Sequence, residues 1–404
     1  MPLWLGLLAG SAGAGACFVG LLVAPRRSQI IAGAGLLLSS VLVVRMFSMI
    51  AAQGVAQATG LAVFFAVAGI AGGYWAAAAA LPHSISQPKI AVAVTDAQPQ
   101  ALPALIILSC AEAERYRIAS TARVIERLMT SDALRLPTSA LPFVFLSEKS
   151  RYRALGDYNP ARAGVTEVAD RVAETLQSKF GTVTVAWCDG SPTLAALLAE
   201  LENRGYSSAV VVTLGPEGSY ITMEAEREAH TGSSSVRLIP AESIWRSDYL
   251  AARLVDRVIE SCRGAVLSEV GVLLAGEGQP VAWEPLGKDW CERENYFNQR
   301  VRLMLLERGF EERNIRISWI EWQSPDITET VRHLAALGCN RLVIAPTTLP
   351  HITLASALDL KHSIEAARLA EDVRVVTLTP WGDDAAMVRA VADTASAALV
   401  RHAE

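Results

Sequence analysis

Glu277 and His351 are the side chains whose type and position most suggest chemistry. Glu277 lies in the Gly-rich turn Gly276–Pro280, directly after the apolar run Val270–Leu274. A carboxylate there can act as a proton acceptor or a metal ligand if burial raises its pKa toward neutrality, and the alternative is a solvated loop glutamate. His351 follows a second apolar run, Leu342–Ala345. Its imidazole can act as an acid–base group or a metal ligand, or it can simply cap a helix or belong to a lid.

One stretch of the chain occurs twice and would position these side chains. Val183–Gly218 and Arg316–His351 align without a gap, with a Ser-Pro pair, a glycine and an apolar run at matching places. The Ser-Pro pair suits the start of a helix, and the glycine suits a left-handed C-cap. The apolar run predicts a strand buried on both faces, as in a parallel sheet. Each copy therefore predicts a strand, a helix and a strand.

Two such units predict an α/β protein with two similar Rossmann-like lobes, each built on a parallel sheet. Ligands of open α/β sheets bind at the carboxyl ends of the strands, so Glu277 and His351 are expected to face one cleft. We place the first lobe at residues 104–262 and the second at residues 263–404. The segment 83–103, which contains three prolines, is expected to be a linker.

The first 82 residues are expected to form an all-α transmembrane region. The mean hydropathy of the chain is +0.30 and 19% of its residues are charged, and the apolar excess lies in this region. Leu3–Ala24, Ile30–Ala52 and Gly60–Leu81 each have spanning length. They predict about three helices, with two as the alternative.

The loop charges of this region predict its orientation. Arg26 and Arg27 are its strongest loop charge, and positively charged loops stay in the cytoplasm. We therefore expect a multi-pass protein of the cell membrane whose C-terminal domain is cytoplasmic. The lipid bilayer is one expected partner. Small residues are frequent in all three apolar runs, as in helices that pack closely in lipid, so a second membrane protein is a candidate partner.

Charge and cysteine usage exclude other classes of function. The net charge is −5, which gives no electrostatic basis for binding nucleic acid, so no such partner is expected. The six cysteines are scattered and form no CxxC motif. This pattern argues against a metal cluster or a disulfide framework and fits a reducing compartment.

Several segments resemble one enzyme family in the right order. LMTSDALRLP at 128–137 is similar to FLSDPRVIDLP, and EKSRYRAL at 148–155 is similar to KSAEAYRKI. The stretch 190–219 resembles GNPSIEEALEEL followed by VVLPLYPQYS, and TLTPWGDDAAMV at 377–388 resembles ALNDSPEFI. The family is ferrochelatase, which inserts ferrous iron into a porphyrin to make haem. The resemblance covers about residues 104–400.

This resemblance implies two chelatase-like lobes and a metal chelatase, which the apolar N-terminal region would anchor in the membrane. Its substrates would be ferrous iron and a porphyrin, and no further cofactor is firmly implied. Two alternatives stay open. The chain could be a non-catalytic binder of porphyrin or haem that acts as a membrane scaffold or regulator, or a two-lobed small-molecule binder without a tetrapyrrole role.

The chain departs from the family at the catalytic residues. The second lobe of the family opens with SAHGLP, and Glu277 stands where that motif has its catalytic histidine. The family's catalytic glutamate would fall within 350–360, where this chain has leucine or alanine. His351 lies about one helical turn earlier. We therefore expect Glu277 and His351 to be an exchanged catalytic pair that also binds the metal.

The resemblance also implies contacts with the substrate. The segment 130–160 is rich in Pro, Arg and Tyr and is expected to be irregular and to cover the cleft. Within it, Tyr152, Arg153 and Tyr158 suit porphyrin ring faces and propionates, with an ordinary surface loop as the alternative. The other candidates, taken from matching motif positions, are Pro216, Ser219, Gln323 and Ser324.

Overall fold

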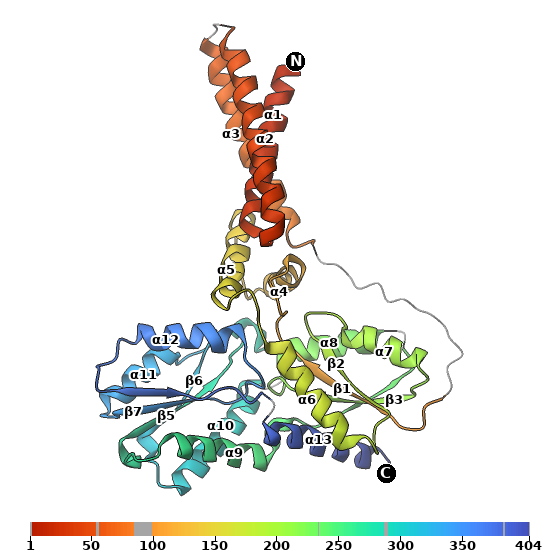
Figure 1. Ribbon diagram of the computed structural model, residues 1–404, viewed down its shortest axis with the longest axis vertical. Helices are drawn as coiled ribbons and strands as arrows, with labels where there is room; N and C mark the ends of the chain where they lie inside the picture. The colour runs from red at the N-terminus through yellow and green to blue at the C-terminus, as the bar shows by residue number, and fades with distance from the viewer. Residues whose placement is uncertain are drawn as a thin grey trace. The chain divides into compact units, whose positions relative to one another are not determined.

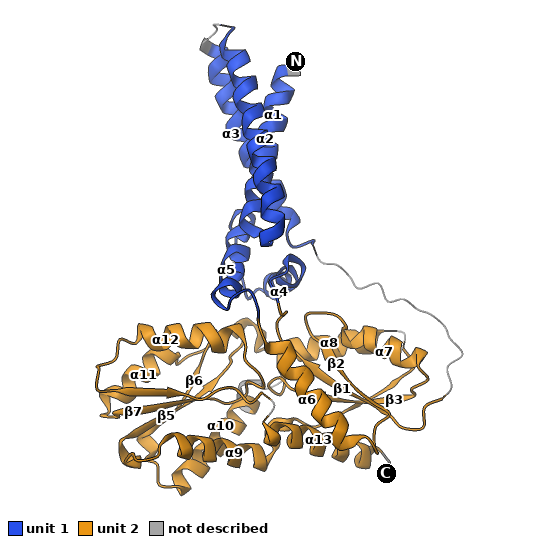
Figure 2. Cartoon of the chain, in the orientation of Figure 1, with its two compact units in different colours: residues 1–87, 115–158 blue, residues 88–114, 159–404 orange. Residues whose placement is uncertain are grey.

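The computed structural model describes residues 2–53, 56–84, 99–232, 234–286, 290–382 and 384–403. Figure 1 shows its elements along the chain. The chain divides into two compact units, coloured separately in Figure 2. We call residues 1–87 with 115–158 the helical unit, and residues 88–114 with 159–404 the α/β unit.

Three long helices begin the helical unit: α1 (Pro2–Val23), α2 (Arg26–Ala51) and α3 (Ala56–Ala80). All three are long and apolar enough to cross a membrane, judged by length and composition. The three apolar runs predicted from the sequence therefore each correspond to a helix of spanning length.

Glycines let α1 and α3 pack backbone to backbone. A Cβ atom at Gly73 would lie 1.9 Å from the carbonyl oxygen of Ala12, and one at Gly15 would lie 2.1 Å from that of Ile70. Only glycine fits at such contacts, as in closely packed membrane helices. Gly15 and Gly73 therefore serve contacts between helices of the same unit.

Two shorter helices, α4 (Ile118–Thr130) and α5 (Leu141–Ala154), complete the helical unit. A 3-10 turn at Thr138–Ala140 precedes α5. The expectation of an irregular segment at 130–160 is therefore wrong. A helix forms here because Leu141 and Phe145 repeat at helical spacing and are fully or almost fully buried. These helices share a core with α1 and its neighbours: Val19, Val23, Leu81, Ala122, Ile125, Leu141 and Phe145.

Side chains from the segment 115–158 cap the carboxyl end of α1. The Nζ of Lys149 donates to the carbonyl of Leu22 at 3.0 Å, and the Oη of Tyr116 donates to that of Val23 at 2.8 Å. The last carbonyls of a helix have no partner within it, so these bonds satisfy them. Burial, and then the charge of Arg153, lowers the pKa of Lys149 to about 8.

The α/β unit contains two four-stranded sheets in which all strands are parallel. Their strand orders are the same, β2-β1-β3-β4 and β6-β5-β7-β8, so the first strand of each lobe is central. The predicted fold class, two similar α/β lobes with parallel sheets after an all-α region, is confirmed. The strands are β1 (Ala104–Ser109), β2 (Thr182–Trp187), β3 (Ser208–Thr213), β4 (Arg237–Pro240), β5 (Val270–Gly276), β6 (Ile315–Trp319), β7 (Arg341–Pro346) and β8 (Arg374–Thr377).

Helices cover both faces of each sheet, as Figure 1 shows. One apolar core runs through both lobes and joins one face of each sheet to α6, α9, α10 and α13. On the opposite faces, α7 and α8 cover the first sheet, and α11 and α12 cover the second. These helices are α6 (Ala161–Leu176), α7 (Leu194–Asn203), α8 (Tyr220–Thr231), α9 (Asp248–Ser261), α10 (Trp290–Glu307), α11 (Ile327–Ala336), α12 (Leu360–Ala366) and α13 (Ala385–Ala403).

One helix from each lobe packs against the other lobe. The C-terminal helix α13 packs against α6, β3 and β4 of the first lobe, and α9 packs against α10 and β7 of the second. The shared core therefore fixes one lobe against the other. The lobe boundaries at 104–262 and 263–404 stay predictions, and most of the expected linker at 83–103 lies outside the described residues.

The helix starts in the two repeated segments differ from the sequence prediction. The peptide bonds before Pro192 and Pro325 are cis, and the residue after each proline is the N-cap. Thr193 Oγ1 accepts from a backbone N–H at 3.2 Å, and Asp326 Oδ1 does so at 2.7 Å. The predicted serine caps are therefore wrong, because the residue after each proline supplies the capping oxygen instead.

The loop between strand and helix is one residue longer in the second repeated segment than in the first. Trp187 N–H donates to the carbonyl of Pro192 at 2.9 Å, and Trp319 N–H donates to that of Pro325 at 3.1 Å, so the loops run from 187 to 192 and from 319 to 325. The extra residue lies in a loop where Trp322 has a φ of +66°. The two repeated segments therefore align with a one-residue insertion in this loop, and the gapless alignment is wrong there.

Candidate active site

Carboxylates gather at the carboxyl ends of the strands in the α/β unit. Glu277 directly follows β5, and Glu112 follows β1, which holds the same central place in the other sheet. Glu321 follows β6. Burial, and then the negative charges of Glu112, Glu321 and Glu294, raises the pKa of Glu277 well above its usual value. A carboxyl group in such a place can take up a proton that an exposed glutamate would release.

Two glycines fix the backbone on either side of Glu277. A Cβ at Gly276 would lie 2.4 Å from the ring of Trp319. Gly278 has a φ of +89°, and a Cβ there would lie 2.0 Å from the carbonyl oxygen of Glu321. The carbonyl of Glu277 accepts from the N–H of Glu321 at 3.0 Å. The loops after β5 and β6 therefore lie in backbone contact, which only glycine allows here.

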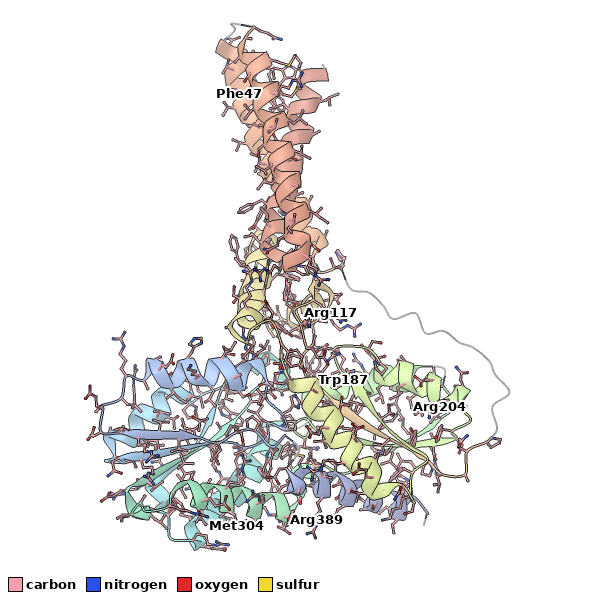
Figure 3. The ribbon with its side chains drawn as sticks, in the orientation of Figure 1. Phe47, Arg117, Trp187, Arg204, Met304 and Arg389 are labelled. Carbon is pink, nitrogen blue, oxygen red and sulfur yellow. The ribbon has the colours of Figure 1, made fainter. Side chains whose placement is uncertain are left out.

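Each sheet has a buried tryptophan at this same edge. Trp187 ends β2 and Trp319 ends β6, where they pair with Ser109 and Gly276. The guanidinium of Arg162 lies 4.6 Å from the ring centre of Trp187, which Figure 3 labels. These aromatic rings make the edge of both sheets apolar beside the carboxylates.

Glu294 is a member of the site that the sequence analysis missed. This α10 residue is only 1% exposed, and its Oε1 accepts a hydrogen bond from Thr348 Oγ1. Burial raises its pKa to about 7, opposed by hydrogen bonds from Thr348 and the backbone of Glu277. Its Oε2 has no hydrogen-bond partner in the part of the chain that the structure describes. The available signal was its place one turn before Phe297, on the buried stripe of the helix.

His351 is buried and neutral. It is 5% exposed, and burial lowers its pKa to about 4, so the imidazole carries no charge at neutral pH. Its Nδ1 has no hydrogen-bond partner among the described residues. A neutral imidazole nitrogen can bind a metal or accept a proton. The residue precedes a π-helix at Ala355–Asp359, an irregularity that is frequent at functional sites.

The described residues show no hydrogen bond or ion pair that joins Glu277 to His351. A carboxylate close to His351 would favour the charged imidazolium, whereas burial opposes it. In the structure burial has the larger effect, because it is the cause that lowers the pKa of His351. The exchanged catalytic pair stays a prediction.

Gln323 lies against the Gly-rich turn, whereas Ser324 is exposed. Gln323 Nε2 donates to the carbonyl of Gln279 at 2.8 Å and to Glu284 Oε1 at 3.4 Å. Ser324 precedes the cis proline. The structure thus brings one member of this pair to the turn that carries Glu277.

Pro216 and Ser219 follow β3 in the first lobe. Pro216 lines a cavity of about 360 Å³. Ser219 is the N-cap of α8, and its Oγ lies 2.8 Å from Thr222 Oγ1. The hydroxyl of Ser219 is therefore engaged in its own helix start, while Pro216 borders open space.

Charged side chains from both lobes line this cavity. Arg246 holds Glu217 through two hydrogen bonds, from Nε at 3.0 Å and from Nη2 at 2.7 Å. Arg293, on α10 of the second lobe, donates to the same carboxylate at 3.1 Å. The cavity is therefore walled by a fixed cluster of charges that links the lobes.

Tyr152, Arg153 and Tyr158 belong to the helical unit. Tyr152 is buried, and its ring centre lies 6.1 Å from that of Tyr116. Arg153 Nη2 donates to Gln29 Oε1 at 3.2 Å, and Tyr158 is exposed. The structure brings the first two to the N-terminal helices, and a substrate role for the three stays a prediction.

Comparison with known proteins shows which family the chain resembles. Residues 292–398, which run from α10 into α13, match the family model described as CbiX. A ferrochelatase from Geotalea uraniireducens (strain Rf4) is 22% identical over 236 residues, which are 54% of this chain and 71% of the relative. The chain is therefore similar to a ferrochelatase and, over residues 292–398, to the chelatase family CbiX.

Three solved structures are similar in fold to this chelatase-like chain. A multi-domain protein from Deinococcus radiodurans, described as structurally similar to chelatases, has a TM-score of 0.46 at 14% identity; the match covers 73% of this chain and 55% of that protein. CbiX, described as the terminal enzyme for siroheme biosynthesis in denitrifying bacteria, has a TM-score of 0.43 at 16% identity, with 73% and 98% covered. SirB from Bacillus subtilis with Fe3+ has a TM-score of 0.44 at 12% identity, with 75% and 97% covered.

The chelatase-like chain contains no preformed multi-ligand metal centre in its described part. No group of three or more His, Cys, Asp or Glu side chains is placed there to bind a metal ion.

Glu294 gives the chelatase-like unit a predicted pH dependence. Because burial raises the pKa of Glu294 from 4.5 to about 7, the folded unit binds this proton more tightly than the unfolded chain does. Its contribution to the free energy of unfolding is full below the unfolded pKa. It should fall by about 3 kcal/mol as the pH rises past the folded pKa.

The variant Glu294→Gln tests this pH dependence. Glutamine still accepts from Thr348 but cannot ionise, so it should flatten the decline of stability with pH. Hydrogen–deuterium exchange of the α10 amides in the full chain, at about pH 5 and about pH 8, measures the effect. An unchanged decline in the variant would contradict the assignment.

Proposed function

We propose that this chain inserts a divalent metal, ferrous iron, into a porphyrin for haem synthesis, at the site formed by Glu277, Glu294 and His351. The observation that carries the proposal is a pair of adjacent carboxylates with raised pKa values, the half-buried Glu277 and the buried Glu294, at the carboxyl edge of the sheets in a chelatase-like chain. Metal insertion into a free-base tetrapyrrole releases two pyrrole protons, one for each new pair of metal–nitrogen bonds. Two carboxylates with raised proton affinity are suitable acceptors for them.

Each side chain has a separate role in this proposal. Glu277 takes the first pyrrole proton, and Glu294, which accepts from the backbone N–H of Glu277, takes the second. Before this proton transfer, His351 would bind the incoming metal through its neutral imidazole, together with the ionised carboxylate of Glu277. The metal then exchanges these ligands for the four ring nitrogens. One divalent ion replaces two protons, so the core of the released complex is neutral, and the two protons remain on the carboxylates.

The substrate contacts are part of the same proposal. Pro216 and Gln323 border the loops that follow the strands. Ser219 and Ser324 are close to them in the chain. Three residues of the helical unit stay candidate porphyrin contacts by their side-chain chemistry: Tyr152, Arg153 and Tyr158.

We also propose that the chain is a multi-pass protein of the cell membrane with its α/β unit in the cytoplasm. Three helices of spanning length and the exposed pair Arg26 and Arg27 at the start of α2 support this. The apolar surface of α2 is exposed, for example at Ile30 and Leu38, and it would contact lipid or another membrane protein. A reporter fused after residue 404 that is active only outside the cytoplasm would refute the orientation.

A metallation assay tests the proposed function. The full chain in detergent is mixed with a free-base porphyrin under reducing conditions, with Fe2+, Co2+, Ni2+ or Zn2+ in separate reactions. The absorption bands of the free base should give way to those of the metal complex, fastest with Fe2+. Faster insertion of another metal would refute iron while keeping the reaction class.

A non-catalytic porphyrin or haem binder is the second candidate function. The observation in its favour is that Glu277 stands at the place of the family's catalytic histidine. A chain that binds porphyrin with no metallation above the protein-free rate would establish this candidate. A chain that binds no porphyrin would refute both.

A further inference from the structure

Two hydrogen bonds at corresponding places join the lobes of the α/β unit. After β1, Glu112 Oε1 accepts from the N–H of Leu354 at 3.1 Å, at the start of the π-helix that follows β7. After β5, Gln279 Oε1 accepts from the N–H of Tyr220 at 3.1 Å, at the start of α8, which follows β3. β1 and β5 are the central strands, and β3 and β7 are their neighbours on the same side. The loop after the central strand of each lobe therefore accepts a hydrogen bond from the start of a helix in the other lobe.

The carboxylate of Glu112 is fixed on both oxygens. Its Oε2 accepts from Asn159 Nδ2 at 3.2 Å. Asn159 is fully buried, and its own Oδ1 accepts from the N–H of Ala161 at 3.0 Å, at the start of α6. Glu112 thus ties its own loop and the first turn of α6 to the segment after β7. A half-buried carboxylate that accepts a hydrogen bond on each oxygen keeps one orientation.

Both bonds end beside residues of the proposed site. Leu354 lies three residues after His351 and is 1% exposed. Tyr220 directly follows Ser219. The bond from Glu112 therefore limits how far the His351 segment can move away from the first lobe. The bond from Gln279 does the same for the start of α8.

We propose that Glu112 is a positioning residue for metal insertion, which seats the His351 segment of the second lobe against the first lobe. Gln279 is its counterpart in the other direction and seats the start of α8. This inference rests on the proposed function, since it gives Glu112 a role in that reaction. A site that exchanges metal ligands needs its imidazole held within a fraction of an ångström.

The variant Glu112→Ala should release the His351 segment. Exchange of the Leu354 amide in the full chain should become about tenfold faster, because the hydrogen bond that protects it is lost. The kcat for porphyrin metallation should fall by roughly 10- to 100-fold, because His351 is displaced. The KM for porphyrin should stay within a few-fold, because Glu112 itself is not a substrate contact.

A swapped pair of residues supplies the rescue. In Glu112→Gln, the remaining side-chain oxygen can still accept from Leu354, but the new amide nitrogen faces the amide nitrogen of Asn159. When Glu112→Gln is combined with Asn159→Asp, the amide at position 112 becomes the donor and the carboxylate at position 159 becomes the acceptor. That carboxylate can still accept from Ala161. The double variant should restore both the exchange rate and kcat to within a few-fold of wild type. A general loss of packing would not be rescued in this way.

The variant Gln279→Ala is the matched control. It should accelerate exchange at Tyr220 and leave exchange at Leu354 unchanged. The inference is overturned if Glu112→Ala leaves Leu354 exchange or kcat at the wild-type level, or if the swapped pair fails to restore them. If wild-type protein never metallates porphyrin, the proposed function and the catalytic role of Glu112 both fail, while the exchange measurements still decide whether Glu112 seats the segment.

Discussion

The variant Glu277→Gln is expected to lose metal insertion by roughly 10²- to 10⁴-fold while it keeps its fold and its affinity for porphyrin. Glutamine has the shape of the glutamate but cannot accept a pyrrole proton. Glutamine also cannot ionise beside the neighbouring carboxylates, so it should not destabilise the α/β unit. The initial rate of change in the porphyrin absorption bands measures the loss. A variant that keeps the wild-type rate would show that Glu277 is not the base.

His351→Ala should cause a loss of similar size, because it removes the proposed metal ligand. Groups that act as one unit are not additive, so the double variant of Glu277→Gln and His351→Ala should be little slower than either single variant. The matched controls are His362→Ala and Glu365→Gln, which change exposed side chains of α12. Both controls should stay within about twofold of wild type. Multiplied losses in the double variant would argue that the two residues act in separate steps.

Gly278→Ala is expected to be the most damaging small substitution at the site. Gly278 and Gly338 both have a φ of +89°, but only Gly278 has a backbone oxygen 2.0 Å from the position of a Cβ, whereas Gly338 has open space. Alanine at Gly338 should therefore cost about 1–2 kcal/mol, from the positive φ alone. Alanine at Gly278 should cost about 3 kcal/mol or more, because the loops after β5 and β6 must separate.

Equilibrium unfolding of the two glycine variants measures this difference. Gly278→Ala should also lose metal insertion, since the separation of the loops moves Glu277. Gly338→Ala, whose glycine follows α11, should keep the wild-type rate per folded molecule. Equal destabilisation by the two substitutions would show that the backbone contact between Gly278 and Glu321 is not the constraint.

The sequence was sufficient for features that depend on local pattern. Apolar runs and their glycine punctuation predicted the parallel strands and the left-handed caps at Gly205 and Gly338, which have φ values of +84° and +89°. The carboxyl-edge rule then directed attention to Glu277 and His351. The environments of these two side chains needed the fold, because their burial comes from segments that are distant in the chain.

Other features depend on contacts that no local pattern records. Glu112 is a glutamate after a strand, like many others, until the fold brings it to Leu354 across the lobes. Tyr152 looked like a residue of a cleft cover, because proline, arginine and tyrosine suggested a loop. Its helix forms in contact with α1 and α3, and an apolar core of that kind comes from distant segments. Glu294 was hidden for the same reason, because its burial depends on Thr348 and the Glu277 turn.

The position of a bound porphyrin tests the central claim most directly. A crystal structure of the full chain with a free-base porphyrin would show which side chains face the ring nitrogens. The account predicts a ring bound at the carboxyl edge of the two sheets, with its nitrogens facing Glu277 on one side and His351 within reach of a metal at the centre. A porphyrin bound with both side chains out of contact with the ring would contradict it.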